Sequence, residues 1–176
     1  HQFLTPNRFG PGDLLGNSVA VSGNTIVASA PGDDDKGTDA GAAYVFARGA
    51  AGFWSQQQKL TASDGRANDL FSYFAVAIEG NTIVVGARRQ DLSSSNPNDN
   101  SGAAYIFTRS GTVWTQQTKL SAGGFFRAPG DEFGTSVSIS GDTVIVSAPH
   151  ETALDGTVNA GTSYVYRLSC TPPFGA

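Results

Sequence analysis

Four aspartates lie within residues 33–39 and form a dense group of carboxylates in one short segment. Ca²⁺ binds about six to eight oxygen ligands and takes carboxylates readily from a short loop that also contains glycines. The segment therefore predicts a calcium site, and a solvated, screened polar loop is the alternative for the same side chains. The predicted ligands are Asp33, Asp34, Asp35 and Asp39.

The rest of the sequence offers little catalytic chemistry. A nucleophile needs a base and a third group that orients the base, and the chain has only two imidazoles, His1 and His150. We therefore expect no catalytic residue and a protein that is not an enzyme. The enzymatic alternative is a copper brace built from His1 and His150, of the kind found in oxidative polysaccharide-cleaving enzymes.

These residues sit in a sequence that repeats itself three times. The segment NSVAVSGNTIVASAP (residues 17–31) returns as FAVAIEGNTIVVGAR (74–88) and as TSVSISGDTVIVSAP (135–149). A polar loop and then GAAYVF, GAAYIF or GTSYVY follow each copy, and the first two copies continue into FWSQQQKL and VWTQQTKL. A period of about 60 residues indicates a repeat architecture.

Each repeat predicts four short antiparallel strands. Apolar and small residues alternate within the runs, and Gly followed by Asn or Asp between the first two runs is typical of a two-residue hairpin. Sheets that are apolar or small on both faces must be covered on both, as the stacked blades of a β-propeller are. We predict an all-β fold of three such repeats, with a spare outer strand before them and a tail after them. The bounds are 1–6 for the spare strand, 13–62, 69–122 and 131–168 for the repeats, and 169–176 for the tail.

A recurring motif precedes each first strand and carries a resemblance to a known family. The segments are Asp13–Gly16, Asp69–Ser72 and Asp131–Gly134, the last containing Phe-Gly, and Ala-Pro ends the second strand of copies one and three. Together with GDDDKGTDAGAAYVF they resemble the FG-GAP repeat of integrin-like β-propellers, in particular the bacterial and algal type. The resemblance implies a propeller fold and calcium in the loop that holds Asp33. Copy two departs from it at Ser72 and Arg88 and has one extra residue, which predicts a β-bulge.

Two other sets of residues recur between copies. Asp13, Asp69 and Asp131 are expected to cap turn amides rather than to bind a ligand. Trp54 and Trp114, on the fourth strands, are expected to pack on a neighbouring blade, with sugar stacking as the alternative.

The third copy ends without a WxQQxKL strand, and HQFLTP at the start of the chain matches QQKLTA one repeat later. We predict that Gln2, Phe3, Leu4 and Thr5 supply the fourth strand of a third blade in a neighbouring chain, which gives a homo-oligomer or a filament. A longer parent chain is the alternative. In the assembly of separate chains, Cys170 would form an interchain disulfide. Before assembly, the three blades would leave two faces uncovered, lined by Val19, Val21 and Ile26 and by their counterparts Val137, Ile139 and Val144.

The composition limits the partners. A net charge of -4 and a pI of about 4.9 provide no basic face for nucleic acid, and no apolar run reaches the roughly 20 residues that span a bilayer. The chain contains no Met and begins at His1, which is typical of a processed product, so we expect it outside the cell or at the cell surface. The predicted function is an extracellular structural or adhesion module that self-associates. The alternative is a calcium-dependent, lectin-like receptor domain for glycan or protein.

Overall fold

The computed structural model spans residues 1–176 and describes all of them except 92–98, 124–127, 154 and 169–176. The described residues form eleven strands and no helix. The described residues therefore contain no helix that is long and apolar enough to cross a bilayer. The strands are β1 (Val19–Ser22), β2 (Thr25–Ala30), β3 (Ala42–Arg48), β4 (Trp54–Leu60), β5 (Phe71–Glu79), β6 (Thr82–Ala87), β7 (Ala103–Ser110), β8 (Val113–Leu120), β9 (Val137–Ser140), β10 (Thr143–Ala148) and β11 (Thr162–Arg167).

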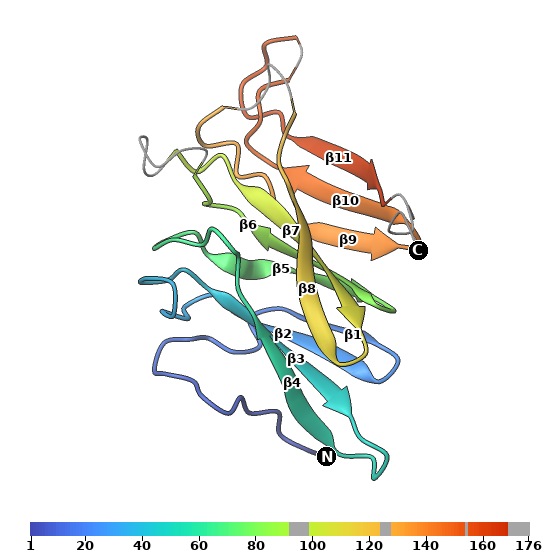
Figure 1. Ribbon diagram of the computed structural model, residues 1–176. Helices are drawn as coiled ribbons and strands as arrows, with labels where there is room; N and C mark the ends of the chain where they lie inside the picture. Colours follow the sequence, from blue (N-terminus) through green and yellow to red (C-terminus); the bar gives the residue numbers. More distant parts are fainter. Residues whose placement is uncertain (92–98, 124–127, 154, 169–176) are drawn as a thin grey trace, which may run out of the picture.

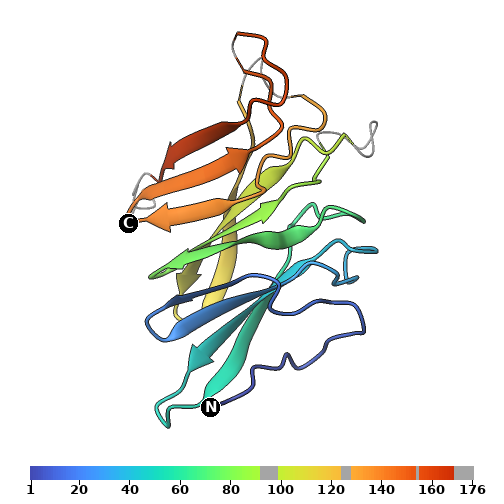
Figure 2. The same ribbon diagram turned by 180° about the vertical axis from the view of Figure 1, so that it is seen from behind.

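The strands make three antiparallel sheets, one for each repeat. Blade one has the order β1-β2-β3-β4 and blade two the order β5-β6-β7-β8, while blade three has β9-β10-β11 within the described residues. Figure 1 shows the blades stacked in chain order, with the N-terminus beside blade one, and Figure 2 shows the same stack from behind. The predicted all-β fold of three blades is confirmed.

Tight hairpins join the first two strands of each blade, as the Gly-Asn and Gly-Asp pairs predicted. Ser22 pairs with Thr25, Glu79 with Thr82, and Ser140 with Thr143, so each loop has two residues. The first loop residue is glycine at positive φ in all three blades, a conformation that side chains other than Gly rarely adopt. The register of β5 against β6 shifts between Phe71 and Val76, so the bulge expected in copy two is also confirmed.

We call the two faces of each blade front and back. The front faces toward the start of the stack, where a preceding blade would lie, and the back faces toward its end. We call the contact between blades one and two joint one, and that between blades two and three joint two. In joint one, Val27 and Val45 on the back of blade one pack against Tyr105 and Trp114 on the front of blade two. Joint two packs the backs of β6 and β7 against β9–β11 in the same way. The motif phenylalanine of blade three, Phe133, is fully buried in joint two and packs edge-on against two tyrosines of β11.

The glycine just before the third strand of a blade, Gly41 before β3 and Gly102 before β7, allows the blades to approach closely. A Cβ on Gly41 would lie 2.2 Å from the carbonyl oxygen of Phe71, and one on Gly102 would lie 2.0 Å from that of Phe133. Both glycines also have positive φ. A residue with a side chain at either position would force the next blade away.

The two ends of the stack leave apolar side chains exposed, but one set differs from the prediction. Val19 and Val21 are exposed at the front of blade one, as expected, whereas Ile26 is partly buried against the cluster on that face. Val137, Ile139 and Val144 instead belong to the core of joint two, so their predicted exposure is wrong. They occupy the same face of their blade as Val19 and Val21, and in blade three that face looks toward blade two. The exposed back face of blade three carries Ile145 and Val165.

Candidate functional site

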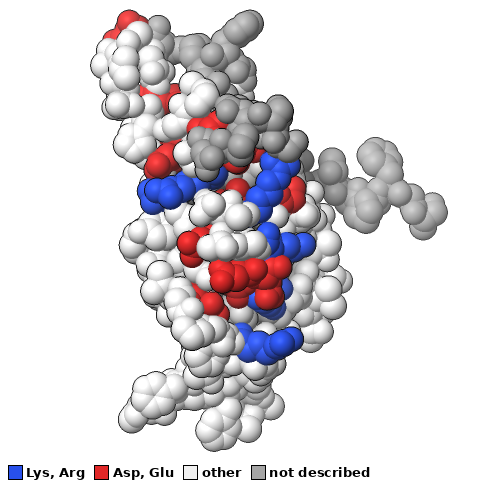
Figure 3. Space-filling model, turned by 90° about the vertical axis from the view of Figure 1, so that its left-hand side faces the viewer, with Lys and Arg blue, Asp and Glu red and all other residues white. Residues whose placement is uncertain are grey.

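The loops that follow the second strand of each blade lie along one side of the stack (left in Figure 1), and Figure 3 views the molecule from that side. Acidic and basic side chains gather there in a central band. In blade one this loop begins with a turn in which the Asp33 N–H donates to the Ala30 carbonyl and the Asp33 carbonyl accepts from Gly41. The turn directs the Asp33 side chain inward, where it is buried.

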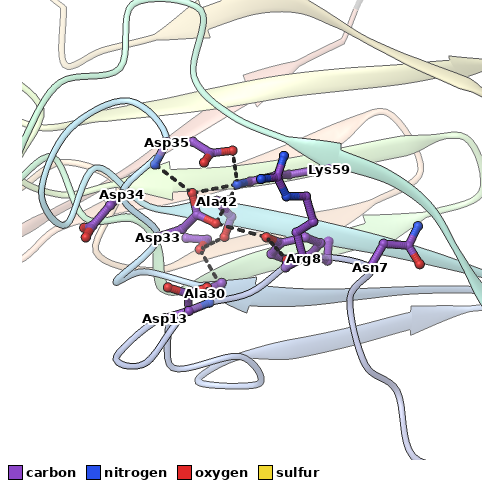
Figure 4. Close-up of polar contacts among 12 residues, drawn as sticks. Asn7, Arg8, Asp13, Ala30, Asp33, Asp34, Asp35, Ala42 and Lys59 are labelled. Carbon is purple, nitrogen blue, oxygen red and sulfur yellow. Dashed lines mark hydrogen bonds and ion pairs between the residues drawn. The ribbon is translucent and has the colours of Figure 1, made fainter.

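Asp33 is the centre of a compact polar network (Figure 4). Lys59 Nζ, from β4, lies 2.6 Å from Asp33 Oδ2 and also pairs with Asp35. The Tyr44 hydroxyl, from β3, donates to Asp33 Oδ2 at 3.0 Å, and the Asp35 N–H donates to Asp33 Oδ1 at 3.1 Å. The cation that pairs with the carboxylates of this acidic loop is therefore the Lys59 ammonium of the chain itself.

The network changes the proton affinities of its members. Burial, followed by the hydrogen bond to Asp33, raises the pKa of the Tyr44 hydroxyl to about 12. Burial lowers the pKa of the Lys59 ammonium, but its hydrogen bonds to Asp33 and Asp35 have the larger combined effect, so its net pKa is raised. The hydrogen bond from Lys59 lowers the pKa of Asp35. All three groups thus keep their usual charge at neutral pH.

The four predicted calcium ligands do not converge on one point. Asp33 and Asp35 engage Lys59, whereas Asp34 points away from them (Figure 4) and accepts a hydrogen bond from the Asp39 N–H. Within the described residues, no group of three or more His, Cys, Asp or Glu side chains is placed to hold a metal ion. As arranged, these side chains suit an ion pair with Lys59, and a calcium ion would have to replace the Lys59 ammonium. Calcium binding stays a prediction.

A cleft of about 470 Å³ opens beside this network. Its walls are Asp33–Asp35, Tyr44 and Lys59 on one side and the segment 7–11 on the other. The N-terminal segment thus contributes a wall to the cleft, which the sequence did not predict.

Blade two has a similar network, but its carboxylate comes from the segment after β4 of blade one and not from the loop after its own second strand. The Tyr105 hydroxyl donates to Asp64 Oδ1 at 2.8 Å, and Lys119 Nζ lies 2.7 Å from Asp64 Oδ2. Lys119 occupies the position in β8 that Lys59 has in β4, but Asp64 follows β4 of the preceding blade. Our sequence reasoning missed the two lysines and the two tyrosines, although the repeated QKL, TKL and AAY triplets were the signal for them.

A family sequence model described as the FG-GAP repeat matches residues 2–46, 54–107 and 114–166. The chain belongs to the FG-GAP repeat family. Its repeats make it an integrin-like β-propeller-type module. A comparison of the sequence with curated proteins finds no match.

The FG-GAP motif aspartates act as turn caps, as predicted. Asp13 Oδ2 accepts from the Gly10 N–H at 2.6 Å, Asp69 Oδ2 from Arg66 at 2.8 Å, and Asp131 Oδ2 from Ala128 at 2.6 Å. At the departure in the second motif, the Ser72 hydroxyl donates to the Ala42 carbonyl across joint one. The loop end of each FG-GAP blade is therefore closed by a buried carboxylate.

Of the two fourth-strand tryptophans, only Trp114 packs between FG-GAP blades. Trp114 is buried in joint one and donates through Nε1 to Gln57. Trp54 and Leu4 are partly buried and pack against the apolar cluster on the front of blade one. The predicted packing on a neighbouring blade is thus confirmed for Trp114, whereas Trp54 packs against its own blade, because the described residues place no blade before it.

The remaining predicted residues are not brought together. His1 packs edge-on against Phe3 beside blade one, whereas His150 follows β10 in blade three, at the opposite end of the stack (Figure 1). The copper brace therefore has no support in the geometry. Cys170 lies outside the described residues, so its interchain disulfide stays a prediction.

Proposed function

We propose that this chain is an extracellular, non-catalytic assembly module in which blade one of one copy stacks on blade three of the next. The proposal rests on the position of the N-terminal segment. Gln2 exchanges two hydrogen bonds with the Trp54 backbone, at 2.7 and 2.8 Å. Gln58, in β4, makes the same pair with the Trp114 backbone, at 2.7 Å each.

The likeness continues beyond this glutamine. The Asn7 N–H donates to Gln56 Oε1 at 2.7 Å, as the Ser63 N–H donates to Gln116 Oε1 at 2.9 Å. Residues 2–7 thus lie on blade one as the end of β4 and its following loop lie on blade two. They occupy the place of a fourth strand from a preceding blade, while β11 has no strand on its far side among the described residues.

The two exposed faces support the same arrangement. Val19 and Val21 at the front of blade one, and Ile145 and Val165 at the back of blade three, are exposed. Their equivalents in joint one, such as Val76 and Val27, are buried. Stacking copies head to tail would bury both faces in the geometry that the chain already uses twice, and such a contact gives a ring if it closes and a filament if it does not.

The test is the native mass over a range of concentrations. We expect oligomers that dissociate on dilution, and a shift to monomer when residues 1–6 are deleted or when Val165→Asp places a charge on the open face. Val158→Asp, at an exposed loop position, is the matched control and should assemble normally. A wild-type chain that stays monomeric at every concentration would overturn the proposal.

The second candidate is a calcium-dependent, lectin-like or protein-binding receptor domain, and the polar cleft beside Asp33 favours it. A glycan array read with calcium and with chelator tests this function directly. Calcium bound only by the native state would raise the melting temperature. The rise should be larger in Lys59→Met, in which no ammonium competes for Asp33 and Asp35. Melting curves that are the same in calcium and in chelator, for wild type and for the variant, would count against the site.

A further inference from the structure

A tyrosine, a carboxylate and a lysine recur where the third and fourth strands of a blade meet. Tyr44 lies opposite Lys59 in the β3–β4 ladder, and Tyr105 lies opposite Lys119 in the β7–β8 ladder. Each lysine also stands over the ring of its tyrosine, at 5.5 and 5.7 Å from the centroid. In both blades the carboxylate receives the tyrosine hydroxyl and the lysine ammonium together.

Blade three has the tyrosine and the carboxylate of this group. The N–H of Glu151 donates to Ala148 and its carbonyl accepts from Gly161, which is the pattern of Asp33 with Ala30 and Gly41. The Tyr164 hydroxyl donates to Glu151 Oε1 at 2.5 Å. Glu151 therefore occupies in blade three the position of Asp33 in blade one.

The other oxygen of this carboxylate is left over. Glu151 is only 2% exposed, and its Oε2 has no hydrogen-bond partner among the described residues. The equivalent carboxylate in blade one gives one oxygen to tyrosine and has both within reach of Lys59. A buried carboxylate oxygen without a partner costs free energy that a cation would recover.

We propose that the edge of β11, which has no strand partner among the described residues, binds an extended segment that carries lysine followed by leucine, and that Glu151 selects this lysine. The inference rests on the proposed function, because it describes the strand that completes blade three. Its register follows from the complete blades, where leucine lies opposite Ala43 or Ala104 and lysine lies opposite the next residue, tyrosine. In blade three the leucine would lie opposite Ser163 and the lysine opposite Tyr164, with its ammonium at Glu151 Oε2.

The inference ranks the possible occupants of the edge. In the N-terminal segment, Leu4 matches the leucine but Phe3 stands at the position of the lysine. A second copy of this chain would therefore fill the apolar part of the site and leave Glu151 without its cation. A fourth strand of the kind seen in β4 and β8 should bind more tightly than residues 2–5 and displace them.

The experiment measures binding of fluorescent peptides to the full chain. The first peptide has the sequence of residues 53–62, FWSQQQKLTA, the second replaces its lysine with methionine, and the third has the sequence of residues 1–7. We expect the lysine peptide to bind about tenfold more tightly than the other two. Equal affinities of the lysine and methionine peptides would overturn the inference.

Two variants assign the effect to Glu151. Glu151→Gln should remove the preference for lysine, whereas Asp155→Asn, which removes a charge from an exposed loop residue, should keep it. Because Glu151→Gln places a new amide in a buried site, Phe3→Lys in the wild-type background provides an independent test. It should tighten self-association about tenfold, and Phe3→Met should not.

These outcomes also separate the inference from the proposed function. A chain that assembles in dilution experiments but binds lysine and methionine peptides equally would contradict only the role of Glu151. A chain that stays monomeric and still prefers the lysine peptide would contradict only self-assembly.

Discussion

The joint between blades one and two and the open back of blade three use equivalent positions in different surroundings. Val27 and Val45 are 0% exposed in the joint, whereas their equivalents Ile145 and Val165 are 44% and 66% exposed. Alanine at position 43, facing the joint, is replaced by the exposed Ser163 in blade three. The same strand pattern therefore makes a core in one place and a surface in the other, and only the presence of a next blade decides which.

The glycine just before the third strand of each blade shows the same difference between a joint and an open face. Gly41 and Gly102 each face a backbone carbonyl of the next blade, at distances that exclude a side chain. At Gly161, the nearest neighbour of an added Cβ is Pro149 of its own blade, at 3.0 Å. Gly161 has a φ of 76°, so its local backbone favours glycine even though the described residues place no blade behind it.

The largest expected effect comes from opening a closed joint. Phe133→Ala removes a fully buried ring that packs on Tyr164 and Tyr166, and should lower the free energy of unfolding by about 3–5 kcal/mol. Phe53→Ala, at a position 70% exposed, is the control and should change it by less than about 0.5 kcal/mol. Chemical denaturation measures both, and comparable losses would contradict the packing of joint two.

A matched pair of valines tests the comparison itself. Val45→Ala should cost about 2 kcal/mol because its methyl groups are enclosed by blade two. Val165→Ala should cost less than about 0.5 kcal/mol in dilute solution, where no blade covers it. At concentrations at which the chain assembles, the cost at Val165 should approach that at Val45. A cost at Val165 that does not change with concentration would argue against use of this face in assembly.

The two lysines should differ in the same direction, by a smaller amount. Lys59→Met leaves Asp33, which is buried, without its cation, and should cost about 2 kcal/mol. Lys119→Met leaves Asp64, whose side chain is 41% exposed, and should cost about 0.5 kcal/mol because water replaces the ammonium. Thermal unfolding at neutral pH measures the difference, and the reverse order would refute the burial argument.

A further effect of similar size is a pH dependence from the turn cap in front of blade two. Burial raises the pKa of the Asp69 carboxyl to about 6, from an ordinary value of 3.8. The folded state therefore holds this proton more tightly than the unfolded state, so ionised Asp69 destabilises the fold above pH 6, and this penalty disappears as the pH falls toward 3.8. We expect Asp69 to raise the free energy of unfolding by about 1–2 kcal/mol between pH 7 and pH 4.

Asp69→Asn isolates this contribution, because the amide keeps an oxygen for the Arg66 N–H but does not titrate in this range. The variant should show a flatter pH profile than wild type, and the difference between the two curves reports Asp69 alone. Parallel profiles would show that the carboxyl has an ordinary pKa in the folded protein.

The sequence alone was sufficient for the features that depend on neighbouring residues. The Gly-Asn and Gly-Asp pairs predicted the hairpins, the alternation of apolar residues predicted the strands, and the extra residue in copy two predicted the bulge, because each is a property of the local backbone. The repeat also predicted which blade has three strands instead of four among the described residues. The turn-capping role of Asp13, Asp69 and Asp131 was predictable because a carboxylate and the amide it caps lie three residues apart.

The tertiary structure alone decided which faces and which charges meet. The alternation in blade three does not say which side looks toward blade two, so Val144 was assigned to the surface and Ile145 was the residue found there. The four aspartates of the acidic loop indicated a cation but not its identity, since Lys59 lies more than twenty residues away in the sequence and reaches Asp33 only because β4 pairs with β3. Charge and apolar pattern are written in the sequence, but the partners of each are set by how the strands and blades pack together.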